Sequence, residues 1–181
     1  MLGNSIRFAK YFFMKKIFLI GRRRTGIQTT LKALNILGYK KSQCLTNKEL
    51  DITSLISEMK NFDICGLVRD YSLEEIRAIE AAFPDSTFIL NKRASSTWYA
   101  SFVRYFDSLK GKHPQSVHTN KGHYVTSYFE QYNTDVGVHF NGRAWKLFTL
   151  TLDGSHTWQG ICAYLRKPIP SVSFPHENRS V

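Results

Sequence analysis

The sequence predicts a single α/β domain of three layers, in which helices cover both faces of a central parallel sheet. Short apolar runs alternate with segments of helical periodicity, as parallel strands and crossover helices do. The 181 residues are 43% hydrophobic, which suits one core but not two enzyme-sized domains. The net charge of +11 predicts an anionic partner.

Three strand-to-helix units follow one another along the chain. The strands are predicted at residues 16–20, 64–68 and 87–90. Each is followed by apolar side chains at helical spacing, and Gly38 and Pro84 end the first two helices. Ser72 and Glu75 form a capping-box pattern at the start of the second helix, and Ser95 or Ser96 can cap the third.

The second half of the chain begins with a polar, basic stretch at residues 108–122, which predicts a functional lid or a mobile segment. A helix is expected around Tyr124 and Phe129, and the alternating residues 136–140 predict a strand. The last helix is expected from Trp158 to Leu165. The Pro-punctuated tail after it is expected to lie on the surface.

The cysteines and the N-terminal segment indicate the cellular compartment in which the protein is expected. Cys44, Cys65 and Cys162 are widely spaced and include no CxxC pair, which argues against disulfides and zinc and predicts a reducing, cytoplasmic setting. No stretch of ~18 apolar residues is present, so no membrane span is expected. Residues 1–13 are expected to be an extension of a domain that covers 14–181, either a leader from an upstream start or an amphipathic helix.

The loop from Gly21 to Gly26 joins the first strand to the first helix, where backbone amides and a helix N-terminus can hold a phosphate. Its G-x4-G spacing matches the start of a nucleotide-triphosphate P-loop. The Lys and Ser/Thr that should follow are Ile27 and Gln28, which weakens a kinase or ATPase interpretation. Arginines at 22, 23 and 24 can replace the missing charge. The alternative is a solvated basic turn.

The stretch IFLIGRRRTGIQTTLKALNILGYK resembles the opening of the P-loop sulfotransferases, whose bacterial and lower-eukaryotic branch typically has G-x-P-R-T-G-T-T-S-x-x-x-A-L-x-x-L-G. The resemblance implies a P-loop NTPase-like fold and 3′-phosphoadenosine 5′-phosphosulfate (PAPS) as sulfuryl donor, with adenosine 3′,5′-bisphosphate (PAP) as product and no metal. It implies that Arg24 supports the bridging oxygen as sulfate leaves. Arg23 replaces the usual Pro, and Ile27 and Gln28 replace two Thr.

Two further segments carry the resemblance. FPDSTFILNKR and the following WYASF are similar to the family's F-P-x-S-K-F-I-L-T-x-R-D-P-x-x-W-Y-x-S, which implies that Arg93 and Ser101 bind the donor's 3′-phosphate. Residues 158–165 and the tail KPIPSVSFPHEN resemble the family's closing motif. Trp98 is expected to be a core residue. The implied donor-binding residues are Gly21, Arg22, Arg23, Thr25, Gly26, Ile27, Gln28, Thr29, Arg93 and Ser101.

The acceptor hydroxyl must lose a proton, which requires a carboxylate or a histidine within hydrogen-bond reach. Asp70 is the first candidate, because it follows the second predicted strand at the edge of the sheet where the loop lies. The alternative for Asp70 is a turn or capping acid beside Ser72. Histidines at 113, 118 and 123 lie in or beside the basic stretch and are secondary candidates.

The partner is expected to be a small-molecule or glycan acceptor. Residues 86–152 hold eight basic side chains against three acidic ones, which hints at an anionic acceptor. A nucleic-acid-binding module is a competing interpretation, but the chain has no recognisable DNA or RNA motif. The remaining alternative is a weak or inactive nucleotide- or anion-binding P-loop protein.

Overall fold

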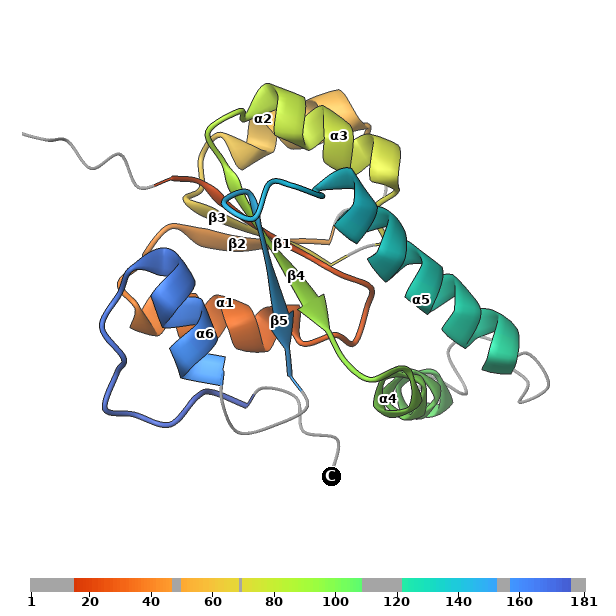
Figure 1. Ribbon diagram of the computed structural model, residues 1–181. Coiled ribbons are helices and arrows are strands. Elements are labelled where there is room, and N and C mark those ends of the chain that lie inside the picture. The colour runs from red at the N-terminus through yellow and green to blue at the C-terminus, as the bar shows by residue number, and fades with distance from the viewer. Residues whose placement is uncertain (1–14, 47–49, 69, 109–121, 153–156, 177–181) are drawn as a thin grey trace, which may run out of the picture.

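The part of the chain that the structure describes has a central sheet of five parallel strands, in the order β2-β3-β1-β4-β5. The computed structural model describes residues 15–46, 50–68, 70–108, 122–152 and 157–176. The strands are β1 (Ile17–Ile20), β2 (Ser42–Leu45), β3 (Ile64–Leu67), β4 (Thr87–Lys92) and β5 (Leu147–Thr151). The parallel sheet with flanking helices confirms the predicted fold class, and Figure 1 shows β1 and β4 at its centre.

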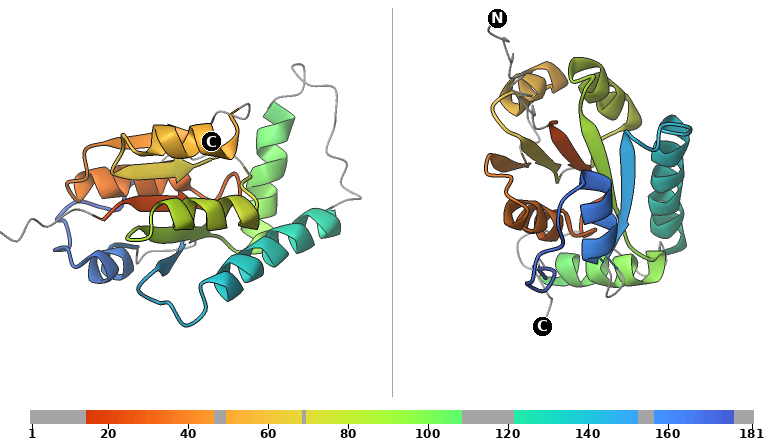
Figure 2. Two further views of the ribbon diagram at one scale, coloured as in Figure 1. Left: turned by 90° about the horizontal axis from the view of Figure 1, so that it is seen from above. Right: turned by 60° about the vertical axis from the view of Figure 1, so that its left-hand side comes forward.

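In the described residues, six helices surround this sheet (Figures 1 and 2). They are α1 (Ile27–Ile36), α2 (Ile52–Met59), α3 (Leu73–Ala82), α4 (Ser95–Ser108), α5 (Gly122–His139) and α6 (Thr157–Leu165). Helices α1 and α6 cover one face, and α2, α3 and α5 cover the other. Helix α4 leaves the carboxyl edge of the sheet and packs against α5.

Each face of the sheet has its own apolar core. Successive side chains of a strand point to opposite faces, so Phe18 of β1 packs with α3 and α5 while Leu19 packs with α1 and α6. Both side chains are fully buried, as are Phe88 and Ile89 of β4. This burial on two faces explains why these strands are continuous apolar runs rather than alternating ones.

The predicted end of α1 and the predicted start of α3 agree with the structure. Gly38 follows α1 with a φ of 95°, and its amide donates to the Asn35 carbonyl. The capping box of α3 is present, because Ser72 Oγ accepts from the Glu75 amide at 3.2 Å and a Glu75 carboxylate oxygen accepts from the Ser72 amide at 2.8 Å. The predicted serine cap of α4 was wrong, because Ser95 and Ser96 lie within this helix and the Ser95 hydroxyl donates to Glu130 Oε1 at 2.5 Å.

The predicted strand at residues 136–140 was wrong, because these residues form the end of α5 and the turn after it. Tyr132, Val136 and Phe140 are all buried at a spacing of four residues, which is helical periodicity. Val138 is 69% exposed, whereas the alternation expected of a strand would have buried it.

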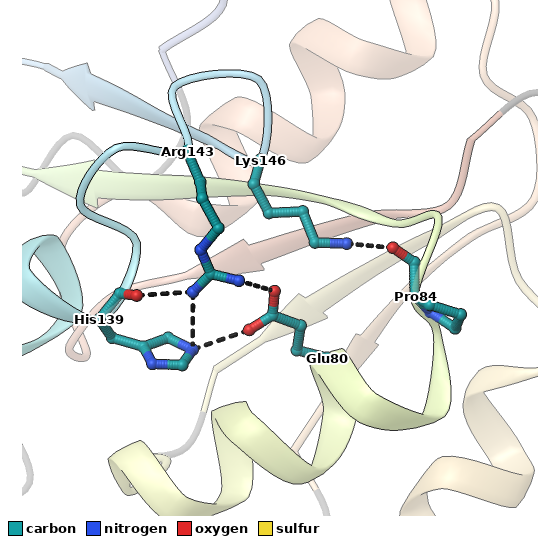
Figure 3. A network of polar contacts seen from close by, with 5 residues as sticks. All are labelled: Glu80, Pro84, His139, Arg143 and Lys146. Atoms are coloured by element: carbon teal, nitrogen blue, oxygen red, sulfur yellow. Dashed lines mark hydrogen bonds and ion pairs between the residues drawn. The ribbon is translucent and has the colours of Figure 1, made fainter.

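A polar network fixes the C-terminal end of α5 to α3 (Figure 3). Glu80 accepts from Arg143 Nη1 at 2.5 Å and contacts His139 Nε2 at 2.7 Å. The buried Lys146 ammonium donates to the Pro84 carbonyl, and desolvation lowers the pKa of Lys146. Because Pro84 and Lys146 precede β4 and β5, this network lies at the amino edge of the sheet.

Two sequence expectations fall outside the described residues, namely the extension at 1–13 and the core of the basic stretch at 109–121. Within the described part of the chain, no helix combines the length and the apolar character needed to cross a membrane.

Candidate functional site

The carboxyl ends of β1, β3 and β4 bring three separate segments of the chain together. The loop Gly21–Gly26 follows β1, Asp70 follows β3, and Arg93 follows β4. Because β1 pairs with both other strands, all three segments lie at one edge of the sheet. This is the edge at which open α/β sheets bind ligands.

The loop after β1 has an unusual backbone conformation. Gly21 and Gly26 have φ angles of 147° and 92°, and a Cβ atom at Gly21 would lie 2.7 Å from the Asn91 carbonyl oxygen. Arg24 also has a positive φ, 69°, which is uncommon outside glycine and concentrates at functional sites. Thr25 closes the turn, since its hydroxyl donates to the Arg22 carbonyl at 2.6 Å.

Helix α1 begins directly after this loop without a side-chain cap. Gly26 is its N-cap, and its first turn contains no acidic residue. Glycine has no side chain with which to cap the helix, and the first backbone amides, which include those of Ile27, Gln28 and Thr29, lie at the positive end of the helix dipole. The Ile27 side chain belongs to the core, so this residue can offer only its amide to a ligand.

The neighbouring threonine hydroxyls are deeply buried. Thr30 Oγ1 lies 3.4 Å from the Gly26 carbonyl oxygen and accepts from Asn91 Nδ2 at 2.6 Å. The Thr30 hydroxyl therefore braces the loop against β4. Thr29 is 6% exposed.

Three residues from separate segments lie next to one another at the loop, namely Arg24, Arg93 and Ser101. Arg24 Nε donates to Ser101 Oγ at 3.3 Å, and Arg93 Nη1 donates to the Arg24 carbonyl at 3.3 Å. Ser101 is 5% exposed and lies two turns into α4, so a strand end and a helix bring Arg93 and Ser101 to the same residue of the loop. The Arg24 guanidinium also lies 5.2 Å from the centre of the Tyr105 ring.

Three guanidinium groups at this edge have an unsatisfied nitrogen. The Nε atoms of Arg22, Arg23 and Arg93 are buried and have no hydrogen-bond acceptor among the described residues. Buried charged donors normally have acceptors, and an anion that enters between them would supply these.

Arg22 lies between two aromatic rings of α5. Its Cζ atom is 4.3 Å from the Tyr128 ring centre and 4.1 Å from that of Tyr132, and the residue is 7% exposed. Arg22 Nη1 lies 3.7 Å from Asp70 Oδ1, whose side chain is half exposed. Burial raises the pKa of Tyr132, against the smaller lowering effects of the Arg22 charge and of a hydrogen bond that the Tyr132 oxygen accepts from the Gly21 backbone.

A cavity of about 770 Å³ opens beside the loop. Its charged lining residues are Arg22, Arg23 and Asp70. Its walls come from the facing surfaces of α4 and α5, namely Trp98, Phe102, Tyr124, Val125, Tyr128 and Phe129. The volume lies in the ordinary range of small-molecule sites.

Trp98 is buried, as expected, but it also lines the cavity and ties the loop to α4, because its indole nitrogen donates to the Arg23 carbonyl at 2.8 Å.

The sequence analysis did not predict that Tyr132 and Asn91 belong to the site. The signal for Tyr132 was present, since Tyr124, Tyr128 and Tyr132 recur every four residues and so share one helix face. His123 is exposed and contacts Ser127 at 2.9 Å, while His113 and His118 lie outside the described residues.

Among the described residues, no group of three or more His, Cys, Asp or Glu side chains could hold a metal ion.

No curated protein matches the chain. A family model described as the sulfotransferase domain matches residues 16–123 and 105–181, which together span the sheet, the loop and all six helices. The chain therefore belongs to the sulfotransferase domain family, whose reaction is the transfer of a sulfuryl group.

Proposed function

We propose that this protein transfers a sulfuryl group from PAPS to the hydroxyl group of a small acceptor. The observation that carries the proposal is the convergence of Arg24, Arg93 and Ser101 beside the uncapped start of α1. The three buried Nε atoms without an acceptor fit a ligand that carries several anionic groups.

Two parts of the site would bind the two anionic ends of a doubly phosphorylated adenosine. Arg93 and Ser101 would hold the 3′-phosphate, as the family resemblance implies. The loop from Gly21 to Gly26 and the first amides of α1 would hold the 5′-phosphosulfate, because helix N-termini and successive backbone amides bind such groups. Arg22 and Arg23 would add positive charge there.

When bound, PAPS supplies an activated sulfuryl group attached to a phosphate that leaves readily. Arg24 would stabilise the negative charge that develops on the leaving oxygen, and a preorganised donor of this kind contributes about 3 kcal/mol to lowering a barrier. Its left-handed backbone conformation and its bond to Ser101 hold the guanidinium in place before reaction.

Asp70 would accept the proton of the acceptor hydroxyl. Its carboxylate lines the cavity next to the loop, and its half-exposed side chain can reach a molecule in the cavity. The ion pair with Arg22 Nη1 would orient this carboxylate. The described helix α3 is capped by Ser72 rather than by Asp70, so the capping role does not occupy this carboxylate.

A ligand-dependent shift of the melting temperature tests the donor site. We expect PAP at 100 times its dissociation constant, in EDTA, to raise the melting temperature by about 5–10 °C. ATP and adenosine 5′-monophosphate, which lack the 3′-phosphate, should need far higher concentrations. Equal shifts with all three nucleotides, or none with PAP, would refute the donor assignment.

Turnover with a radiolabelled sulfuryl donor tests the reaction itself. We expect Asp70→Asn to lower the rate of transfer at least about 100-fold while PAP binding stays intact. A wild-type rate in this variant would remove Asp70 as the base. PAP binding without transfer to any acceptor would favour the alternative of an inactive anion-binding protein.

A further inference from the structure

The cavity between α4 and α5 differs in character from the anion-binding loop beside it. Six of its nine lining residues are apolar or aromatic, and five of these six carry rings. Tyr124 is 84% exposed and Tyr128 is 64% exposed, so large ring surfaces face the cavity and solvent. An exposed aromatic surface of this kind, next to a reactive loop, marks a ligand site.

The rings of the cavity form an ordered stack rather than a random lining. The Trp98 and Phe129 ring centres lie 4.1 Å apart with an interplanar angle of 8°, which joins α4 to α5 face to face. The ring centres of Phe102 and Trp98 lie 5.2 Å apart, and the two ring planes are tilted by 36° relative to each other. Walls built from such faces and edges complement a flat ring by offset or edge-to-face packing.

The charged lining residues of the cavity, Arg22, Arg23 and Asp70, all come from the loops after β1 and β3, whereas the lining residues on α4 and α5 are apolar or aromatic. The Trp98 indole nitrogen donates to the Arg23 carbonyl, and Arg22 is covered by two tyrosine rings and paired with Asp70. A sugar carries several hydroxyl groups, each of which loses free energy when it is buried without a partner. An aromatic alcohol has one hydroxyl, which Asp70 can receive.

From these contacts we infer that the acceptor is an aromatic alcohol of phenol type, whose ring lies between α4 and α5 and whose hydroxyl points toward Asp70 and the loop. The inference rests on the proposed sulfuryl transfer and names its substrate class. In the step, the acceptor oxygen forms a bond to sulfur, the bond from sulfur to the leaving phosphate oxygen breaks, and Asp70 takes the hydroxyl proton. An aromatic alcohol of this type differs from the anionic acceptor that the charge of residues 86–152 suggested.

Binding of 2-naphthol to the full chain, measured by isothermal titration with and without saturating PAP, tests the cavity independently of activity. We expect 2-naphthol to bind in both conditions, its saturated analogue decahydro-2-naphthol to bind about tenfold more weakly, and methyl glucoside not to bind at the same concentrations. Naphthol binding without PAP binding would overturn the donor proposal and leave the aromatic cavity standing. PAP binding with no preference for naphthol over methyl glucoside would overturn the inference.

Two exposed aromatic residues offer a matched pair of variants. Tyr124→Ala removes a ring from the cavity wall, and Trp145→Ala removes a ring that is 63% exposed and lies outside the cavity. Both positions are exposed, so neither change should prevent folding. We expect Tyr124→Ala to raise the KM for 2-naphthol about five- to tenfold with unchanged PAP affinity, and Trp145→Ala to leave both unchanged.

Phe102 provides a second variant in the cavity wall, so that the test does not depend on Tyr124 alone. Phe102→Leu keeps an apolar side chain on α4 but removes the ring that contacts Trp98. We expect it to raise the naphthol KM while transfer to a saturated alcohol is unchanged. Unchanged naphthol KM and binding in both Tyr124→Ala and Phe102→Leu would overturn the inference.

Discussion

Replacing Arg93 by alanine removes one side of the proposed clamp for the donor. Arg93 is the guanidinium that follows β4, and it donates to the Arg24 carbonyl at 3.3 Å. Its Nε atom is buried and has no acceptor among the described residues, so a phosphate would gain a charge-assisted hydrogen bond there. The substitution therefore removes a ligand contact and also loosens the loop residue proposed to act on the leaving oxygen.

The expected loss of PAP affinity follows from the lost ligand contact. A hydrogen bond between charged partners is worth about 1.5–3 kcal/mol. Its loss corresponds to a PAP affinity that is roughly 10- to 150-fold lower. Isothermal titration of PAP into the wild type and Arg93→Ala, at fixed ionic strength and in EDTA, measures this ratio directly.

Arg104 provides the matched control on the neighbouring helix. It is exposed, and its Nε donates to the Ala100 carbonyl of α4 at 3.3 Å. Arg104→Ala changes the net charge by the same amount as Arg93→Ala, so it corrects for long-range attraction of the nucleotide. We expect less than about a twofold change in this control. Equal losses in the two variants would refute the clamp.

Three other substitutions have distinct expected outcomes. Arg24→Ala should lower turnover about 100-fold while changing PAP affinity by less than about fivefold, measured by single-turnover kinetics and titration; a wild-type rate would exclude its catalytic role. Glu80→Gln leaves Arg143 and His139 without their carboxylate partner, and should lower the melting temperature by roughly 4–8 °C without affecting PAP binding; an unchanged melting temperature would contradict the network in Figure 3. Burial raises the pKa of Cys65 from 9.0 to about 12, so the folded state keeps a proton that the unfolded state loses as the pH rises above 9, and the free energy of unfolding falls over this range. In Cys65→Ala this fall should be shallower by about 1.4 kcal/mol per pH unit in urea unfolding series, and identical slopes would contradict the raised pKa.

The central part of the fold could be predicted from the sequence because local signals there agree with the final packing. Strand β1 is a run of four apolar residues that ends at Gly21, and the capping box of α3 uses residues three apart. The loop after β1 could also be recognised locally, since its glycines and arginines are consecutive. Its meeting with Arg93 and Ser101 followed from the rule that parallel strands end at one edge.

Other elements carry weaker local signals. Strand β2 (SQCL) lies at the edge of the sheet, where its half-exposed polar residues resemble a loop. Helix α2 is a short helix of eight residues, and Asp51 caps it by accepting from the amides of Thr53 and Ser54. The end of α5 resembled a strand because residues 136, 138 and 140 alternate, whereas the spacing from Tyr132 to Phe140 is helical.

The cavity between α4 and α5 could be recognised only in the structure, because its walls come from two helices that the sequence does not connect by any local pattern. The ring stack of Trp98 and Phe129 joins residues 31 positions apart, and Tyr128 and Tyr132 cover an arginine more than 100 residues away. Such contacts depend on the crossing of α4 and α5 and not on propensity or spacing within either helix.

A crystal structure of the protein with PAP bound is the most direct measurement. We predict the 3′-phosphate within hydrogen-bond distance of Arg93 and Ser101, and the 5′-phosphate against the Gly26 turn and the first amides of α1. The 5′-phosphate should also leave the cavity between α4 and α5 open for an acceptor. A nucleotide bound with its phosphates away from Arg93 and the start of α1, or bound inside the aromatic cavity, would contradict the proposed site.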